Sequence, residues 1–235
     1  MVNPRPRVSV RELLPGQPVV VLDDALRDPR SLVDWAVARR GAFARQGHNA
    51  FPGPELRLPE PVTAALVEVF NRHARTALGM RRTLRAHSRL SLVALPPHRL
   101  QPAQWLCHRD RLQQAPGERV AASVLYLFDD PALGGTSFFQ PRWPAARIDA
   151  LVADSIRLAP ADFAHRHGLS PGYPVEDLPA FRRVATVEAR FNRLIFYDGD
   201  VFHSGDIRQP QRLSEDPARG RLTLNGFFTG TPAAR

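Results

Sequence analysis

The hydrophobic pattern of this chain changes from a helical to an extended period near residue 80, and this change limits the folds open to it. Residues 28–41 and 61–79 carry apolar side chains at helical spacing, so two amphipathic helices are predicted there. Asp28, which precedes a proline, is the predicted N-cap of the first helix. Strands are predicted where β-branched and aromatic runs lie between Gly, Pro and Asp, at residues 18–22, 89–95, 121–128, 193–205 and 220–228.

This order of elements predicts an α+β chain in which helices brace a β-sandwich or barrel, because strands and helices do not alternate regularly. A double-stranded β-helix, or jelly roll, fits the pattern best. We expect one domain over residues 1–235, with residues 1–85 as a mainly helical N-terminal support. Residues 47–60 are rich in proline and are predicted to be loop, and residues 139–190 are predicted to be a long excursion between strands.

Composition narrows the class of protein and the kind of metal site. Hydrophobic residues make up 43% of the 235 positions, which is enough to form a core. No apolar run reaches the roughly 20 residues of a membrane span, and the N-terminus lacks a secretory signal, so we expect a cytoplasmic protein without membrane contact. Cys107 is the single cysteine, so internal disulfides and cysteine-rich zinc sites are excluded and any metal must be bound by His and carboxylate.

The formal charge of +9 favours anionic partners. The arginines are scattered along the chain and are not interleaved with aromatic residues, as they are in nucleic-acid-binding patches. We therefore do not expect nucleic acid as a partner, and a coding bias is the simpler explanation of the charge.

His108 and Asp110 form an H-x-D triplet, in which residues i and i+2 of an extended segment point to the same side. His203 follows 95 positions later, at the end of a strand rich in aromatic and β-branched residues. Two His and one carboxylate on one face of an octahedral ion leave three positions open, which suits Fe(II), O2 and a chelating oxoacid. H-x-D alone arises by chance in many chains, so the hypothesis depends on a further element.

That element is Arg221, which opens a predicted strand in which Arg221 and Thr223 alternate with leucines. A guanidinium can bind the distal carboxylate of 2-oxoglutarate bidentately, and the threonine hydroxyl can add one hydrogen bond. Arg212 and Arg219 are alternatives for this role. Tyr126 could donate its hydroxyl to the oxoacid, although an aromatic residue in a strand is more often part of the core.

Other residues have weaker claims to the site. His165 and His167 form an H-x-H pair in a predicted loop, without a carboxylate in a comparable context, and a solvated loop is the simpler interpretation. Gln104, Trp105 and Asn225 could line the substrate side of the site. Gly134 and Gly135 are predicted to form a turn.

The order H-x-D, distant His, R-x-T resembles the motif of the jelly-roll 2-oxoglutarate/Fe(II)-dependent dioxygenase superfamily. Residues 126–139 and 192–205 resemble the corresponding strands of its prolyl-hydroxylase-like members, and the N-terminal part resembles a poorly characterised bacterial branch. The resemblance implies a jelly roll, Fe(II) bound by the two histidines and the aspartate, and 2-oxoglutarate bound by Arg221 with Thr223. One departure is the gap of 18 residues between His203 and Arg221, which is longer than is common in members.

The predicted function is therefore oxidative decarboxylation of 2-oxoglutarate coupled to hydroxylation of a small-molecule or peptide substrate, with ascorbate as a supporting reductant. An anionic substrate is preferred because the chain is rich in arginine. Two alternatives are a non-catalytic jelly-roll module that binds Zn or Mn, and an oxygenase directed to nucleic acid. Desaturation would use the same centre, and the sequence gives no indication of the substrate's identity or of the oligomeric state.

Overall fold

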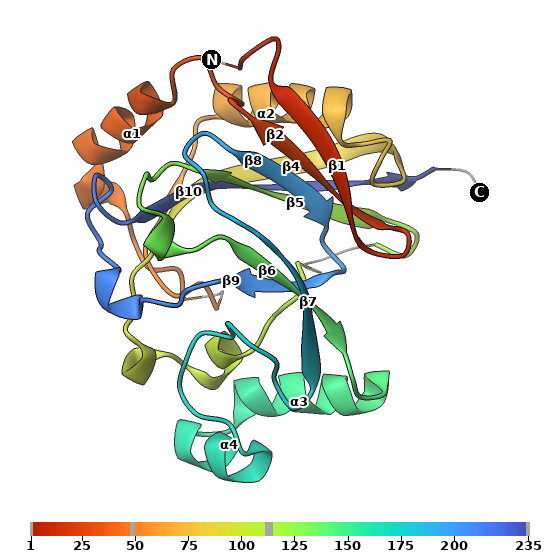
Figure 1. Ribbon diagram of the computed structural model, residues 1–235, viewed down its shortest axis with the longest axis vertical. Coiled ribbons are helices and arrows are strands. Elements are labelled where there is room, and N and C mark those ends of the chain that lie inside the picture. Colours follow the sequence, from red (N-terminus) through yellow and green to blue (C-terminus); the bar gives the residue numbers. More distant parts are fainter. Residues whose placement is uncertain (1, 48–49, 111–114, 234–235) are drawn as a thin grey trace.

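The computed structural model describes residues 2–47, 50–110 and 115–233, which form two antiparallel sheets with helices outside them (Figure 1). The larger sheet has the order β1-β2-β8-β5-β10-β4-β3 and the smaller sheet the order β7-β6-β9. The strands are β1 (Arg7–Leu14), β2 (Gln17–Asp23), β3 (Glu55–Arg57), β4 (Met80–Val93), β5 (Arg119–Tyr126), β6 (Thr136–Pro141), β7 (Phe181–Val187), β8 (Leu194–Asp198), β9 (Phe202–Gly205) and β10 (Arg221–Pro232).

Successive segments alternate between the two sheets. After β4 in the larger sheet, His108 pairs with His203 at the edge of the smaller sheet, and the chain then returns to the larger sheet in β5. β6 and β7 lie in the smaller sheet, β8 in the larger, β9 in the smaller and β10 in the larger. This alternation is a double-stranded β-helix, so the predicted α+β jelly roll is confirmed.

Two helices, α1 (Pro29–Ala38) and α2 (Glu60–His73), cover the outer face of the larger sheet (Figure 1). Asp28 caps α1 as predicted, because its carboxylate accepts a hydrogen bond of 3.1 Å from the Ser31 N–H. Phe70 of α2 stacks on Phe228 of β10 with ring centroids 4.2 Å apart, which joins this helix to the sheet. None of the described helices is long and apolar enough to cross a membrane.

The N-terminal support contains three strands, β1, β2 and β3, beside its helices. β2 matches the strand predicted at residues 18–22, whereas β1 and β3 were not predicted. β1 is an edge strand whose first six residues are all exposed, so it has no alternation of buried and exposed positions to reveal it. Its pairing with β2 comes from main-chain hydrogen bonds, which any sequence can make. β3 is three residues long and lies inside the segment 47–60 that was predicted to be loop.

The segment 139–190, predicted as a long excursion between strands, contains regular elements that were not predicted. The segment contains α3 (Ala145–Arg157), α4 (Pro160–His167) and β7, and the helices pack outside the smaller sheet (Figure 1). α3 buries Ile148 and Leu151, but most of its other residues are alanine, aspartate and arginine, and the prolines around it favour a loop in the sequence. The predicted strand 193–205 is in fact two strands, β8 and β9, which lie in different sheets.

Candidate metal centre

Three predicted ligands, His108, Asp110 and His203, meet in space. Each offers one ligand atom, and these atoms all lie within 4.8 Å of one another. The Nε2 of His203 is 3.3 Å from Asp110 Oδ2, and the Nε2 of His108 is 3.7 Å from Asp110 Oδ1. Among the residues that the structure describes, no other group of three such side chains is close enough to hold an ion.

Main-chain pairing places these ligands. The His108 N–H donates to the His203 carbonyl at 3.0 Å, and the His203 N–H donates back to the His108 carbonyl at 2.9 Å. The Asp110 N–H then donates to the Gly199 carbonyl at 2.8 Å, just before β9. Because His108 and Asp110 are two residues apart on this extended segment, their side chains point to the same side as His203.

The environment of the three ligands is asymmetric. His203 is 5% exposed, whereas the side chain of His108 is 58% exposed, so one flank of the centre is accessible to solvent. The Nδ1 of His203 lies 3.0 Å from the Val201 carbonyl; an Nδ1–H donating there would leave Nε2 for an ion. Burial opposes a charge on His203, but the Asp110 carboxylate outweighs this effect and raises the pKa of His203 above its usual value.

This donor set suits a divalent first-row ion. Two imidazoles and a carboxylate with accessible positions are the ligands of non-haem Fe(II), and a structural zinc site would be closed by a fourth protein ligand. Burial raises the pKa of Asp110, but this is more than offset by His203, so the carboxyl pKa is lowered and the group is available as an anion. Cys107 is 1% exposed and burial raises the pKa of its thiol, so this cysteine is a small buried residue of the core.

Arg221 begins β10 and is only 4% exposed. Its Nε donates to the Leu133 carbonyl at 3.0 Å, and its Nη2 donates to the Gly135 carbonyl at 2.7 Å. Arg212 is exposed and pairs with Asp130, and Arg219 is also exposed. Of the three candidate arginines, only Arg221 therefore lies inside the protein.

The two other predicted oxoacid residues are close to Arg221, but their hydroxyls have protein partners. Tyr126 is fully buried, its ring centre is 5.9 Å from the Arg221 guanidinium carbon, and its hydroxyl is 2.8 Å from Thr136 Oγ1. Burial raises the pKa of Tyr126 to about 12, so the hydroxyl stays protonated. Thr223 lies opposite Tyr126 in the β10–β5 register, and its hydroxyl donates to the Ser91 carbonyl at 3.4 Å.

The turn before β6 connects Arg221 to the strand that carries His203. The Gly135 carbonyl accepts from Arg221 and also from the Asp206 N–H at 3.1 Å. Gly134 has a φ of +78°, and a Cβ on either glycine would lie 2.0 Å or less from a backbone oxygen. The predicted glycine turn is confirmed, and its cause is the close approach of two backbones.

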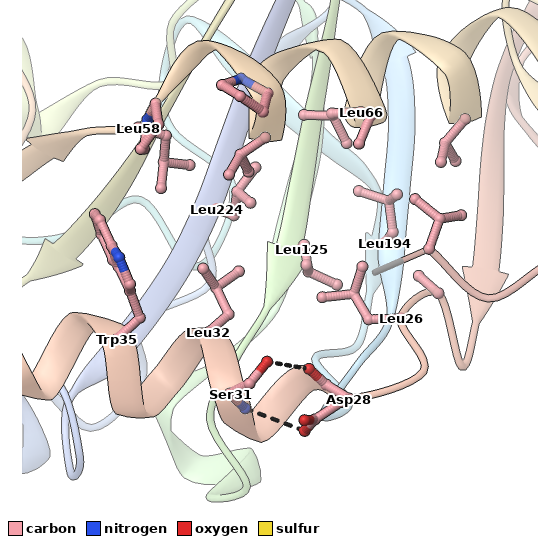
Figure 2. A pocket seen from close by; sticks show the side chains of 17 residues that line it. Leu26, Asp28, Ser31, Leu32, Trp35, Leu58, Leu66, Leu125, Leu194 and Leu224 are labelled. Carbon is pink, nitrogen blue, oxygen red and sulfur yellow. Dashed lines mark hydrogen bonds between the residues drawn. The ribbon is translucent and has the colours of Figure 1, made fainter.

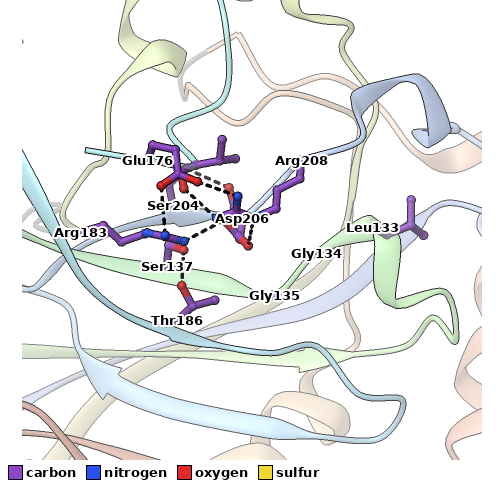
Figure 3. Close-up of polar contacts among 12 residues, drawn as sticks. Leu133, Gly134, Gly135, Ser137, Glu176, Arg183, Thr186, Ser204, Asp206 and Arg208 are labelled. Carbon is purple, nitrogen blue, oxygen red and sulfur yellow. Dashed lines mark hydrogen bonds and ion pairs between the residues drawn. The ribbon is translucent and has the colours of Figure 1, made fainter. Parts of the chain in front are cut away.

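Beyond this turn, an ion-pair network ties the segment after β9 to the segment before β7 (Figure 3). Arg208 pairs with Asp206 at 3.0 Å and with Glu176 at 2.7 Å, and Arg183 pairs with Glu176 at 3.0 Å. These contacts hold the end of the His203 strand from the outer side of the smaller sheet.

The remaining predicted candidates have structural contacts. Trp105 is a core residue, 3% exposed, and its indole N–H donates to the Leu100 carbonyl. Gln104 hydrogen-bonds the Ala50 carbonyl. His165 is exposed and His167 pairs with Asp154 at 3.0 Å; both histidines lie on α4, so their placement in a loop was wrong.

Sequence reasoning missed a polar set on the inner faces of β3, β4 and β10: Glu55, Arg57, His87, Arg89 and Ser91. Asn225, which was predicted to line the site, belongs to this set because its amide donates to Ser91 Oγ at 3.0 Å. In residues 85–91, larger polar side chains alternate with small or apolar ones, which indicates that one face of the strand is polar. Only the pairing of β4 with β10 places this polar face on the same side of the sheet as Arg221.

A cavity of about 350 Å³ lies on the other face of the larger sheet, between α1, α2 and the sheet (Figure 2). Its lining is hydrocarbon except for Asp28 and Ser31, whose polar groups hydrogen-bond each other at the start of α1. Asp28 is the one titratable residue among those that line it, and its carboxylate caps α1, so the cavity is separate from the candidate centre.

Comparisons with known proteins give one family and several distant structures. A family described as "Family of unknown function (DUF6445)" matches residues 4–228. No curated protein matches the sequence.

Three of the similar solved structures are distant in sequence. A prolyl-4-hydroxylase from Pseudomonas putida is 16% identical, with a TM-score of 0.46 and coverage of 92% of this chain and 93% of that one. HygX from Streptomyces hygroscopicus, solved with nickel, 2-oxoglutarate and hygromycin B, is 14% identical, with a TM-score of 0.49 and coverage of 91% and 82%. EvdO2 from Micromonospora carbonacea var. aurantiaca, solved with 2-oxoglutarate, is 13% identical, with a TM-score of 0.45 and coverage of 98% and 96%.

Proposed function

The chain belongs to the DUF6445 family, whose function is unknown, and we propose that it is a non-haem Fe(II)- and 2-oxoglutarate-dependent oxygenase. The observation that carries the proposal is the meeting of His108, Asp110 and His203, with ligand atoms within 4.8 Å and one flank exposed. Two imidazoles and a carboxylate leave the open positions that an oxoacid and O2 need.

Arg221 supports the choice of 2-oxoglutarate. It is 4% exposed, its guanidinium hydrogen-bonds only neutral carbonyls, and it has no ion-pair partner among the described residues. A buried charge without a counter-ion is costly, so a ligand carboxylate beside it would be favourable. The second carboxyl end of a dicarboxylic oxoacid would supply this charge.

The protein's part in the reaction is to hold and orient. His108, Asp110 and His203 would hold Fe(II), which with O2 as the oxidant and 2-oxoglutarate as co-substrate would supply the chemistry for hydroxylation of a C–H bond. The Val201 carbonyl orients the His203 ring, and Tyr197 packs against it with ring centroids 4.7 Å apart, which keeps water from its buried side. Arg221 would fix the length and direction of the oxoacid.

The test is turnover without substrate. Full-length protein with Fe(II), ascorbate and 2-oxoglutarate should form succinate slowly, and His203→Ala and Asp110→Ala should form none above the protein-free background. His167→Ala is the matched control, because this histidine lies outside the centre and should leave the rate unchanged.

Calorimetry with Co(II) under the same conditions separates the alternatives. Tight Co(II) binding without any succinate would contradict the oxygenase and leave a metal-binding jelly-roll module. Loss of succinate in His203→Ala together with loss of Co(II) binding would support the proposal.

A further inference from the structure

Next to the metal centre, the larger sheet presents a polar inner surface. The register places Arg57, Arg89 and Asn225 side by side on β3, β4 and β10, and His87 opposite Phe227 in the next inward-facing row. Arg57 and His87 are exposed, and the Arg89 side chain is 21% exposed. A jelly-roll interior is normally filled by apolar side chains, so this polar surface needs a reason.

Arg89 is held in one orientation. Its Nε lies 2.5 Å from Glu55 Oε1, and its guanidinium carbon lies 4.8 Å from the centre of the Phe227 ring. Ser91 donates to the same Glu55 oxygen at 3.2 Å, so the carboxylate is fixed as well. Among the described residues, the two terminal nitrogens of Arg89, Nη1 and Nη2, make no hydrogen bond. A carboxylate can bind these two nitrogens of a guanidinium with both of its oxygens.

The aromatic part of the surface is continuous with the arginine. The His87 ring stacks on the Phe227 ring with centroids 4.7 Å apart and an angle of 15°. The Phe227 ring therefore contacts both His87 and the Arg89 guanidinium. Glu55 neutralises one arginine, and Arg57 on the neighbouring strand leaves the surface cationic. Its charge reaches the centre, because Arg89 acts electrostatically on both His108 and Asp110.

We propose that this surface binds the substrate, and that the substrate is a small organic acid whose carboxylate pairs with Arg89 and Arg57 while an apolar part lies on the exposed His87 ring, which stacks on Phe227. The reaction of that substrate rests on the proposed function, whereas its binding needs no metal. Arg89 and Arg57 are therefore specificity-determining residues, and Glu55 and Ser91 are positioning residues for Arg89.

The test uses metal-free, full-length protein with phenylacetate as the probe and phenylacetamide as its neutral match, titrated by ligand-detected NMR. The acid should bind about tenfold more tightly than the amide. Arg57→Gln and Arg89→Lys should each weaken acid binding about tenfold and leave amide binding unchanged. Lysine keeps a positive charge opposite Glu55, so the fold should be retained, but it lacks the planar guanidinium that binds a carboxylate bidentately.

Arg82→Gln is the matched control, because Arg82 is an exposed arginine on the same strand outside this surface. Equal affinities for the acid and the amide would overturn the proposal. So would acid binding that survives Arg57→Gln and Arg89→Lys but is lost in Arg221→Lys, since the acid would then occupy the buried arginine. A protein that binds the acid as expected but forms no succinate supports this surface and contradicts only the proposed reaction.

Discussion

At the scale of single residues, Arg221 is a buried guanidinium that has no ion-pair partner within the described part of the chain. Burial lowers the pKa of its guanidinium, and its hydrogen-bond partners are three neutral carbonyls. These carbonyls orient the guanidinium but do not neutralise its charge. The arrangement suits a residue that binds an anionic ligand.

Replacing this guanidinium with a point charge should weaken the oxoacid specifically. In Arg221→Lys, the apparent KM for 2-oxoglutarate should rise about tenfold or more, because an ammonium cannot donate to the turn and to a carboxylate in the same geometry. The succinate assay at varied 2-oxoglutarate measures it, with the exposed Arg212→Lys as control. An unchanged KM would mean that another group holds the oxoacid.

The glycine at position 135 is required by packing. A Cβ there would lie 2.0 Å from the Val187 oxygen and 2.8 Å from the Ala189 nitrogen, and both are backbone atoms that cannot move alone. Gly135→Ala should therefore lower the free energy of unfolding by about 2–3 kcal/mol in urea denaturation. Gly172→Ala, with nothing within 4 Å of the added carbon, should change it little. A Gly135→Ala protein as stable as the wild type would contradict this contact.

At the scale of elements, a partly buried ion pair links the β1–β2 hairpin to the segment that leads into β8. Arg193 donates to both oxygens of Asp23, at 2.7 and 3.1 Å, and this lowers the pKa of the Asp23 carboxyl below its usual value. Because the folded pKa is below the unfolded one, the stabilisation is fully present above the unfolded value of 3.8 and is lost as the pH falls through the lower folded pKa.

Asp23→Asn should therefore cost about 2 kcal/mol of unfolding free energy at pH 7, and the difference from wild type should shrink as the pH falls below 3.8. Denaturation midpoints across a pH series measure this. Asp24→Asn is the control, because Asp24 pairs with Arg7 at the exposed surface and should have a small effect. A pH-independent difference would show that the ionised pair is not its cause.

The two helices on the outer face leave the 350 Å³ cavity between them, and this offers a stabilising change. Ala65 of α2 lines the cavity, so Ala65→Leu should fill part of it and raise the free energy of unfolding by about 1 kcal/mol. Ala64→Leu, on the exposed side of the same helix, should have no such effect. Thermal melts distinguish the two, and a lower melting temperature for Ala65→Leu would mean that the space is too tight for the added carbons.

At the scale of the whole molecule, metal binding should stabilise the fold, because the ligands come from segments 95 residues apart. An ion that binds only the folded state adds about 2.7 kcal/mol at one hundred times its Kd. Mn(II) or Co(II) should raise Tm, and a chelator should reverse the shift. Asp110→Ala should show no shift, whereas His165→Ala should keep it. A shift that persists in Asp110→Ala would place the ion elsewhere.

Much of this architecture follows from local pattern. The helices α1 and α2 and the central strands β5, β8 and β10 were predictable because each shows a regular apolar period. The edge strand β1 was not, because its first six residues are exposed and show no alternation. The helices α3 and α4 were not either, although α3 buries Ile148 and Leu151, because they lie in a proline-rich segment whose composition favours a loop.

The sequence by itself determined the kinds of ligand and their order, since H-x-D on an extended segment already faces one side and only His and carboxylate are available for a metal. Only the tertiary structure decided which of three arginines is buried, that Tyr126 and Thr223 have protein partners, and that Arg89 lies near the centre with Arg57 beside it on the next strand. The physical reason is that strand register and the facing of two sheets are set by contacts between distant segments. Local sequence determines on which face of its strand a side chain lies, but the long-range contacts determine which residues surround that side chain.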